Sequence, residues 1–373
     1  GNPLKISLHV SSNTPIVLCR YKTIGVLELI SKKCSHFGKI LQKCGVNVHY
    51  LGSKAKLLPF IQRTICDVVG ANLHDKIFCD MFAGSGTVSL AYKNDVGILI
   101  ANDIEYYSYV LLRNMLRTKP LEGLDEAVEK LFTCKGVKGK IFKSYASGGG
   151  EGRNYFSDEN ASMIDALRQK IETHASDEAL YFCLLASLIE SAHSVSNTAS
   201  IYSAFLKHLK PLAQKTLEFK PLVYERTRVP THVYCEDANV LIERIEGDIL
   251  YLDPPYNHRQ YGANYHLLNT IAHYDTFVPK GKTGVRAYES SRFCKAKTAF
   301  DALDEIVRKA EFKTLFLSYN NEGLLPQETL SAMMKKYGRY TLFSHEHSRF
   351  KTHVHHGENP KTIEFLHVLE KKY

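Results

Sequence analysis

The sequence predicts an α/β protein in which a doubly wound domain, built around a mixed seven-strand sheet, is interrupted by a long helical insertion. Three observations predict this fold class. A strand, a glycine-rich turn, a helix and a second strand follow one another within residues 76–103. Strand-like apolar segments return after residue 231, and the stretch between the two halves reads as mostly helical. Loops and insertions are where such scaffolds carry specificity.

The expected domain boundaries lie where these patterns change. We expect the α/β domain to comprise residues 46–104 and 231–373, with residues 105–230 as the helical insertion. Residues 1–45 contain one apolar stretch and one helix-like run. No chemistry can be attached to that segment, so its role stays open.

The first half of the α/β domain consists of short elements. Ser53 is placed to cap a helix that runs to about Val69, and residues 76–80 and 97–103 are expected to be strands. A glycine-rich turn at residues 83–86 opens the helix between the two strands. This arrangement requires a right-handed crossover and parallel pairing of the strands.

Later elements complete the predicted sheet. In the insertion, the clearest helices span residues 159–174 and 178–193. Five further strands are expected at residues 232–235, 248–252, 314–318, 340–343 and 363–369.

Composition narrows the class of protein. The chain has 373 residues and 44% hydrophobic content, enough for a large buried core. No apolar run approaches the roughly 18–20 residues of a membrane span, and the start lacks the layout of a secretory signal. The nine cysteines include no CxxC pair, which is typical of reduced thiols in a cytoplasmic protein. A net charge of +9 suits a polyanionic partner without establishing one.

The strongest chemical signal is an apolar strand, residues 250–252, that ends in Asp253-Pro254-Pro255-Tyr256. The exocyclic N6 of adenine is a poor nucleophile because its lone pair is delocalised into the ring. A carboxylate and a backbone C=O that each accept one N6 hydrogen bond offset the positive charge that N6 gains as it attacks a sulfonium methyl group. Two prolines fix that carbonyl outward, and a tyrosine offers a flat face for an unstacked base. The alternative is a Pro-Pro turn with a capping aspartate.

A second signal is the glycine turn in FCDMFAGSGT, residues 78–87. Glycines at a strand-to-helix turn let a ligand lie against the backbone, and helix-start N–H groups favour its carboxylate. Asp103 ends the next strand, where dinucleotide folds place a carboxylate on ribose hydroxyls. The spacing is not GxGxxG and suits an amino-acid-bearing nucleoside better than a pyrophosphate. The alternative is an ordinary tight turn.

A third, weaker signal lies just upstream, where Ser53 and Lys54 stand at an expected helix start. Both could meet a ligand carboxylate there. The alternative is a capped surface helix.

Together these segments resemble the alpha class of DNA adenine-N6 methyltransferases, the Dam-like enzymes, and most closely the FokI-type modification methyltransferases of type IIS restriction systems. The resemblance runs from about residue 50 to the C-terminus. It preserves the segment order YxGSKxKLL, FxDxFAGSGT, an acidic strand end, a helical insertion, CEDAN and DPPY. Further similar segments lie at residues 152–160, 197–206, 256–266 and 318–323.

The resemblance implies a Rossmann-like methyltransferase fold that transfers a methyl group from S-adenosylmethionine to N6 of adenine in double-stranded DNA. The residues implied to lie around the methionine part of the cofactor are Tyr50, Ser53, Lys54, Asp80, Phe82, Gly84 and Ser85. Asp103 is implied to hold the ribose, Asp237 to accept from the cofactor's adenine, and Ile104 to pack on that ring. The implied catalytic residues are Asp253, Pro254, Pro255 and Tyr256.

The resemblance also implies partners, and the cysteine pattern favours a location. The expected substrate is duplex DNA with one adenine flipped out of the stack, and a separately encoded restriction endonuclease is a candidate partner. No metal and no membrane are expected, and the expected location is the cytoplasm.

Site recognition is expected in the insertion. Its candidate phosphate contacts are Arg153, Lys143, Lys207, Lys210 and Lys215, and its candidate base readers are Asn154, Tyr155 and Asn160. The loop at residues 257–297, rich in basic and aromatic residues, is expected to close over the flipped base.

Several rival interpretations remain. The same chemistry could act on adenine in RNA or on a protein amide, although Asp at the first position of DPPY favours adenine. A non-catalytic DNA-binding relative would have no need of Asp80, Asp103 and Asp253 together. A cluster of histidines suggests a metal, but we expect a basic or solvated hairpin there because the stretch lacks a full ligand set. These histidines are His345, His347, His353, His355 and His356.

Overall fold

The computed structural model describes residues 54–199, 201–347 and 362–372. The predicted site residues Tyr50 and Ser53, the segment 1–45, and three of the five clustered histidines lie outside these ranges. The ring of His345 stacks on Phe60, with ring centroids 5.3 Å apart.

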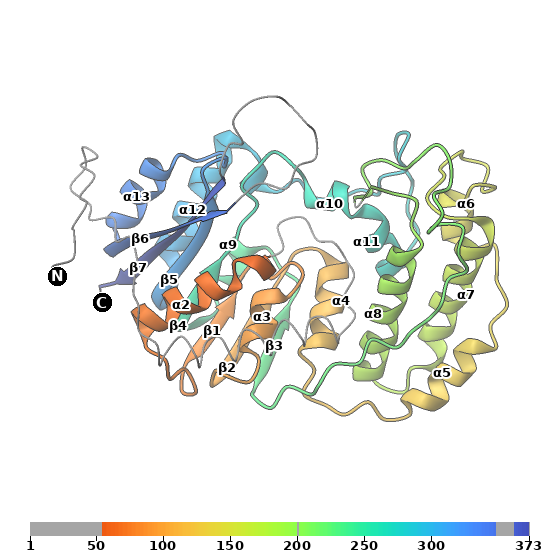
Figure 1. Ribbon diagram of the computed structural model, residues 1–373, viewed down its shortest axis with the longest axis horizontal. Coiled ribbons are helices and arrows are strands. Elements are labelled where there is room, and N and C mark those ends of the chain that lie inside the picture. The colour runs from red at the N-terminus through yellow and green to blue at the C-terminus, as the bar shows by residue number, and fades with distance from the viewer. Residues whose placement is uncertain (1–53, 200, 348–361, 373) are drawn as a thin grey trace, which may run out of the picture.

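One seven-strand sheet forms the centre of the α/β part (Figure 1). Its strand order is β3-β2-β1-β4-β5-β7-β6; the first five strands are parallel, β7 is antiparallel to β5, and β6 is antiparallel to β7. The strands are β1 (Ile77–Asp80), β2 (Ile98–Asn102), β3 (Thr231–Tyr234), β4 (Glu246–Leu252), β5 (Glu311–Asn320), β6 (Gly338–His347) and β7 (Thr362–Lys371). The predicted mixed seven-strand sheet is therefore confirmed.

Helices cover both faces of the sheet because successive strand side chains point to opposite sides. On β1, Phe78 faces one core and Cys79 the other. Along the chain, the helices of the α/β part are η1 (Lys54–Lys56), α2 (Leu58–Val69), α3 (Thr87–Tyr92), α9 (Ala238–Leu241), η2 (Arg292–Cys294), α12 (Ala296–Lys309) and α13 (Gln327–Lys335). The core of α2 and α3 lies on one face, and that of α9, α12 and α13 on the other.

The helix expected from Ser53 begins later than predicted. Its α-helical part starts at Leu58, after the short 3-10 helix η1, and ends at Val69. Pro59 explains the position, because proline fits the first turn of an α-helix and is excluded from its interior.

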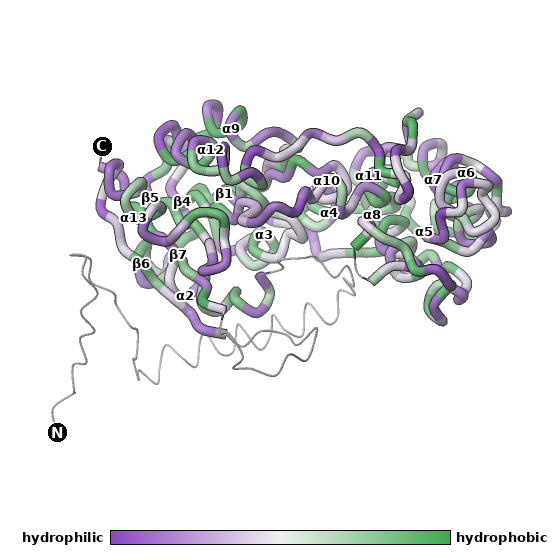
Figure 2. The backbone as a smooth tube through the Cα atoms, turned by 90° about the horizontal axis from the view of Figure 1, so that it is seen from above, coloured by the Kyte–Doolittle hydropathy of each residue, from purple (hydrophilic) through white to green (hydrophobic). Residues whose placement is uncertain are grey.

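A second core is built from helices on one side of the sheet (Figures 1 and 2). Its helices are α4 (Tyr106–Met115), α5 (Leu124–Phe132), α6 (Lys140–Tyr145), α7 (Asp158–His174), α8 (Glu178–Ser194), α10 (Tyr261–Asn264) and α11 (His266–His273). Helix α4 joins the two cores: Tyr107 and Val110 pack among the helices, while Leu112 and Met115 pack with the sheet. The chain after DPPY, as α10 and α11, is thus part of the helical core.

The prediction that the insertion, residues 105–230, is mostly helical does not hold for its last part. Among the described residues of the stretch 195–230, none belongs to a helix or strand. Pro211 and Pro221 interrupt helical hydrogen bonding there. Of the helices that the structure describes, none is long and apolar enough to cross a membrane.

Candidate active site

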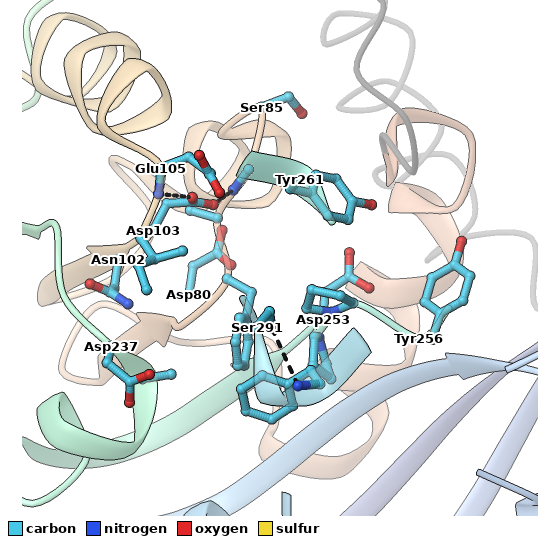
Figure 3. A pocket seen from close by; sticks show the side chains of 18 of the residues that line it. Asp80, Ser85, Asn102, Asp103, Glu105, Asp237, Asp253, Tyr256, Tyr261 and Ser291 are labelled. Carbon is cyan, nitrogen blue, oxygen red and sulfur yellow. Dashed lines mark hydrogen bonds between the residues drawn. The ribbon is translucent and has the colours of Figure 1, made fainter. Parts of the chain in front are cut away.

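A pocket of about 1120 Å³, including space open to solvent, lies where the parallel strands β1, β2 and β4 end (Figure 3). Ligands of doubly wound sheets bind in the crevice at the carboxyl ends of the strands. Every predicted site residue within the described ranges lines this pocket: Lys54, Asp80, Phe82, Gly84, Ser85, Asp103, Ile104, Asp237, Asp253, Pro254, Pro255 and Tyr256.

The glycine turn after β1 is fixed by hydrogen bonds to the end of β2. Asp103 Oδ2 accepts from the Gly84 N–H at 2.7 Å, and Asp103 Oδ1 accepts from the Glu105 N–H at 2.9 Å. Gly84 and Gly86 have φ of 53° and 73°, a left-handed conformation that favours glycine. A Cβ on Gly86 would also lie 2.8 Å from Met115 Sδ. The turn therefore needs its glycines, and its Gly84 N–H holds the Asp103 side chain on the pocket wall.

Asp80, at the end of β1, is almost fully buried beneath the turn. Its Oδ2 accepts from the Ser89 N–H at 3.0 Å and from Ser89 Oγ at 2.7 Å, which ties β1 to helix α3. Burial, with the charges of Asp253 and Asp103, raises the pKa of Asp80 to about 7 against the hydrogen bonds from Ser89. Burial likewise raises the pKa of Asp103 to about 6. The pocket floor is therefore rich in carboxylates and suited to a ligand with positive charge.

The DPPY segment follows β4 directly and is joined to Lys54. Lys54 Nζ lies 2.9 Å from Asp253 Oδ1, and the same Nζ lies 5.5 Å from the centre of the Tyr256 ring. Burial raises the pKa of Asp253 to about 6, while Lys54 lowers it and Glu364 raises it. The Tyr256 ring meets that of Tyr319 edge to face, with centroids 5.9 Å apart. At neutral pH this site presents an ionised carboxylate beside a fixed aromatic face.

The far side of the pocket is formed by the β2 and β3 strand ends. Asp237 caps helix α9, with its Oδ1 accepting from the N–H groups of Asn239 at 2.8 Å and Val240 at 3.2 Å. The Asn102 side chain holds the preceding residue, Glu236, through both its backbone N–H and C=O. Ile104 is 48% exposed, an apolar platform beside these polar groups.

Sequence reasoning missed one wall of the pocket. Tyr261 stands across the cavity from Asp253 (Figure 3), while Phe293 meets Phe82 edge to face, with centroids 5.1 Å apart. The Ser291 N–H donates to Gln260 Oε1 at 2.9 Å, joining the two chain segments of this wall. In the sequence, only the aromatic and basic composition of residues 257–297 indicated that Tyr261 and Phe293 could belong to the site. Also missed were the lining residues Asn102, Glu105, Glu236, Gly262, Glu289 and Arg292.

Three of the eight candidate DNA contacts in the insertion are buried, contrary to expectation. Tyr155 is fully buried, and its hydroxyl donates to Tyr202 O at 2.6 Å. Asn160 is 2% exposed, and Arg153, 7% exposed, donates to backbone carbonyls. The assignment of Tyr155, Asn160 and Arg153 as DNA contacts is wrong, because their polar atoms satisfy buried backbone groups.

The fold and this pocket define an α/β enzyme of the doubly wound class, with a carboxylate-rich site at the ends of its parallel strands. Its family follows from comparison with known families. Residues 50–333 match the model of the D12 class N6 adenine-specific DNA methyltransferases, and the chain belongs to that family. The predicted family and enzyme class are confirmed.

Type II methyltransferases are among its relatives. The chain is 46% identical to the type II methyltransferase M.NlaIII of Neisseria lactamica, over 87% of this chain and 100% of that protein. It is 34% identical to M.FokI of Planomicrobium okeanokoites, over 87% of this chain but only 53% of that longer protein. M.CviAII of Paramecium bursaria Chlorella virus 1 is 35% identical, over 82% and 94% of the two chains.

A solved structure of a conserved hypothetical protein from Streptococcus pyogenes also matches 82% of this chain and 94% of its own. Its TM-score is 0.28 and its sequence identity 8%, too low to support any functional inference.

Proposed function

We propose that this enzyme transfers the methyl group of S-adenosylmethionine to N6 of a specific adenine flipped out of duplex DNA. The observation that carries the proposal is a shared cavity. Asp103 follows strand β2 and Asp253 follows strand β4, the two strands that flank β1, and both residues line one pocket. A donor and an acceptor can therefore meet inside it.

The lining of the pocket fits S-adenosylmethionine. The cofactor is a nucleoside that carries an amino acid and a sulfonium charge, so it needs hydroxyl acceptors, an apolar platform and negative charge. Asp103 would accept from the ribose and Ile104 would pack on the adenine ring. Asp237 Oδ1 serves the helix cap, so its second oxygen would accept from the cofactor's adenine. The Asp80 carboxyl, with a pKa of about 7, lies beneath the glycine turn and would ionise more readily beside the sulfonium charge.

The cofactor supplies an electrophilic methyl group; the protein prepares the acceptor. Asp253 and the Pro254 C=O would each accept a hydrogen bond from the target N6, stabilising the positive charge that develops there. The Tyr256 ring would hold the face of the flipped base. Lys54 keeps Asp253 ionised and in place through its 2.9 Å ion pair.

Domain roles and context belong to the same proposal. Residues 46–104 and 231–373 would carry catalysis, and residues 105–230 would carry most of the recognition. Type II relatives support a role in a restriction-modification system with a separately encoded endonuclease. The six cysteines that the structure describes are all free thiols, in keeping with action in the cytoplasm.

One assay tests the function. Purified protein is incubated with methyl-labelled S-adenosylmethionine and unmethylated plasmid DNA, and N6-methyladenine is mapped by sequencing. We expect label in duplex DNA at N6 of adenine within one short sequence. Label on RNA alone, on a protein amide, or nowhere would overturn the proposal.

A further inference from the structure

An irregular loop after helix α8 is held in one conformation by the side chains of three asparagines, two of them buried. Asn154 Nδ2 donates to Leu206 O at 3.3 Å and to Lys207 O at 3.0 Å. Asn197 Nδ2 also donates to Leu206 O, at 3.0 Å, and Asn197 Oδ1 accepts from the Lys210 N–H at 2.9 Å. We call residues 203–216 the pinned loop.

A third asparagine fixes the end of the pinned loop. Asn160 Nδ2 donates to Lys215 O at 2.8 Å, and its Oδ1 accepts from the Leu217 N–H at 2.8 Å. A loop without helix or strand leaves its backbone groups unpaired unless side chains satisfy them. Three asparagines do so here, and the loop is therefore a preorganised surface.

The pinned loop exposes groups that the fold itself does not use. Leu206 is 39% exposed and Leu212 is 52% exposed, while the side chains of Lys207, His208 and Lys215 face solvent. Apolar and cationic groups held outward on a fixed backbone are typical of a contact surface.

A second exposed segment lies beside it. Residues 278–286, here the basic turn, close through hydrogen bonds between Lys280 and Val285. The buried Arg153 donates to Gly281 O and Lys282 O, both at 3.3 Å. The Lys280 and Lys282 side chains are exposed. At Gly284, φ is +68° and a Cβ would lie 2.7 Å from Arg153 Nε, so the turn is packed closely on the arginine.

The basic turn and the pinned loop lie side by side, because two consecutive residues hydrogen-bond to them. Arg153 holds the basic turn, and Asn154, the next residue, holds the pinned loop. In Figure 1 both segments lie on one side of the molecule, above α8 and α11. Arg153 behind the basic turn and three asparagines behind the pinned loop thus shape one surface.

This surface is continuous with the pocket. The Tyr202 N–H, just before the pinned loop, donates to Asn264 O of helix α10 at 2.7 Å, and α10 supplies Tyr261 to the pocket wall. After the basic turn, the chain passes Tyr288, whose ring packs on Gly262, and reaches the pocket at Glu289.

We propose that the pinned loop and the basic turn together contact the duplex beside the target adenine and set which sequence is methylated. This inference rests on the proposed function. Lysines on both segments match the charge of phosphates, and a fixed backbone can present polar and apolar groups to a groove. It locates recognition in two irregular segments, one of them outside residues 105–230, instead of on the insertion helices.

The charge test uses the double variant Lys207→Ala/Lys282→Ala. If each lysine contacts a phosphate, the slope of log Kd against log salt for duplex plasmid fragments falls by about 2, and Kd rises roughly 3–10-fold. S-adenosylmethionine affinity, measured by calorimetry, stays within twofold. The matched control is Lys170→Ala: this exposed lysine lies on α7 about 18 Å along the helix axis from its start near Asn154.

The specificity test exchanges residues 203–216, with or without 278–286, for those of a relative that methylates a different sequence. Mapping of N6-methyladenine should show that the methylated sequence changes. An exchange of the α5 segment, residues 124–132, is the control and should leave it unchanged. In addition, Asn154→Ala should broaden the set of methylated sequences, and Asn154→Asp, which replaces the donors to the loop carbonyls with a carboxylate that repels them, should do the same.

Failures of the two proposals are distinguishable. If the unaltered protein methylates no DNA, the proposed function fails. If it methylates DNA, and active variants keep the original sequence, Kd and salt slope, then the proposed surface fails alone. A salt slope that falls equally in the Lys170→Ala control would also overturn it.

Discussion

Lys54 Nζ lies 2.9 Å from Asp253 Oδ1, which joins the first described helix to the motif after strand β4. Lys54 is only 5% exposed, so the ion pair is largely shielded from water. Burial alone disfavours a charged carboxylate, and the lysine partly offsets that effect. The lysine that the sequence suggested for a ligand carboxylate lines the pocket and holds the candidate catalytic carboxylate.

The first prediction concerns pH. Ionised Asp253 is a stronger acceptor and its charge stabilises the positive charge that develops on N6, and its pKa is about 6. The single-turnover methylation rate should therefore rise with pH through about 6 and level off above about 7. Lys54→Met removes the charge that lowers this pKa, so the rise should move to higher pH. Rates from pH 5 to 9, at saturating cofactor and DNA, measure both.

The control for this prediction is Lys56→Met, an exposed lysine of the same short helix. It should leave the pH midpoint in place. An unchanged midpoint in Lys54→Met would show that Asp253 ionisation does not limit the rate.

The second prediction is that Asp253→Ala nearly abolishes turnover. Loss of one acceptor of this kind lowers the rate by roughly 10²–10³-fold or more. Cofactor affinity should stay within a few-fold, because the lost hydrogen bond acts on the target amine. Single-turnover kinetics and calorimetry separate the two effects, and near-normal methylation would remove Asp253 from its role.

The parts of the site that the sequence predicted are those set by short-range geometry. Gly84 and Asp103 belong to one strand-turn-helix-strand unit, whose crossover brings the turn and the second strand end together. Asp253 follows an apolar strand that had to lie in the same sheet. Parallel strands end at one edge, so these residues had to meet there.

Residues that long-range packing brings to the pocket could not be predicted from the sequence pattern. Tyr261 reaches the pocket because α10 and α11 pack into the helical core. Phe293 reaches it because η2 packs with α12 on the sheet, and no periodicity in residues 257–297 shows either placement. Likewise, an arginine or asparagine side chain such as that of Arg153 or Asn160 can bond to DNA or to backbone carbonyls. Their burial, which decides between DNA and backbone carbonyls, depends on how the irregular stretch folds over them.

The third prediction is that Asp103→Ala weakens S-adenosylmethionine binding by about 1.5–3 kcal/mol, the range for a hydrogen bond to a charged group. The effect includes loss of the acceptor for Gly84 N–H, which shapes the turn. DNA affinity without cofactor should change little. Calorimetry that shows unchanged cofactor affinity would remove Asp103 from the site, provided that circular dichroism shows an intact fold.

The last prediction separates the ring of Tyr256 from its hydroxyl. If the aromatic face holds the flipped base, Tyr256→Phe should retain most activity, because the ring, its contact with Tyr319 and its place over Lys54 are all kept. Tyr256→Ala should lose the stacking, worth roughly 1–3 kcal/mol per base. The backbone bond from Leu324 N–H to Tyr256 O, at 2.9 Å, survives in both variants, so the loop is held alike.

The measurement for Tyr256 is kcat/KM and Kd on one duplex substrate and on the same duplex carrying a mismatch at the target adenine. A mismatch lowers the cost of flipping the base, so it should restore part of the activity of Tyr256→Ala but change Tyr256→Phe little. Equal losses in the two variants would show that the hydroxyl matters, and would replace stacking with a hydrogen bond as the role of Tyr256.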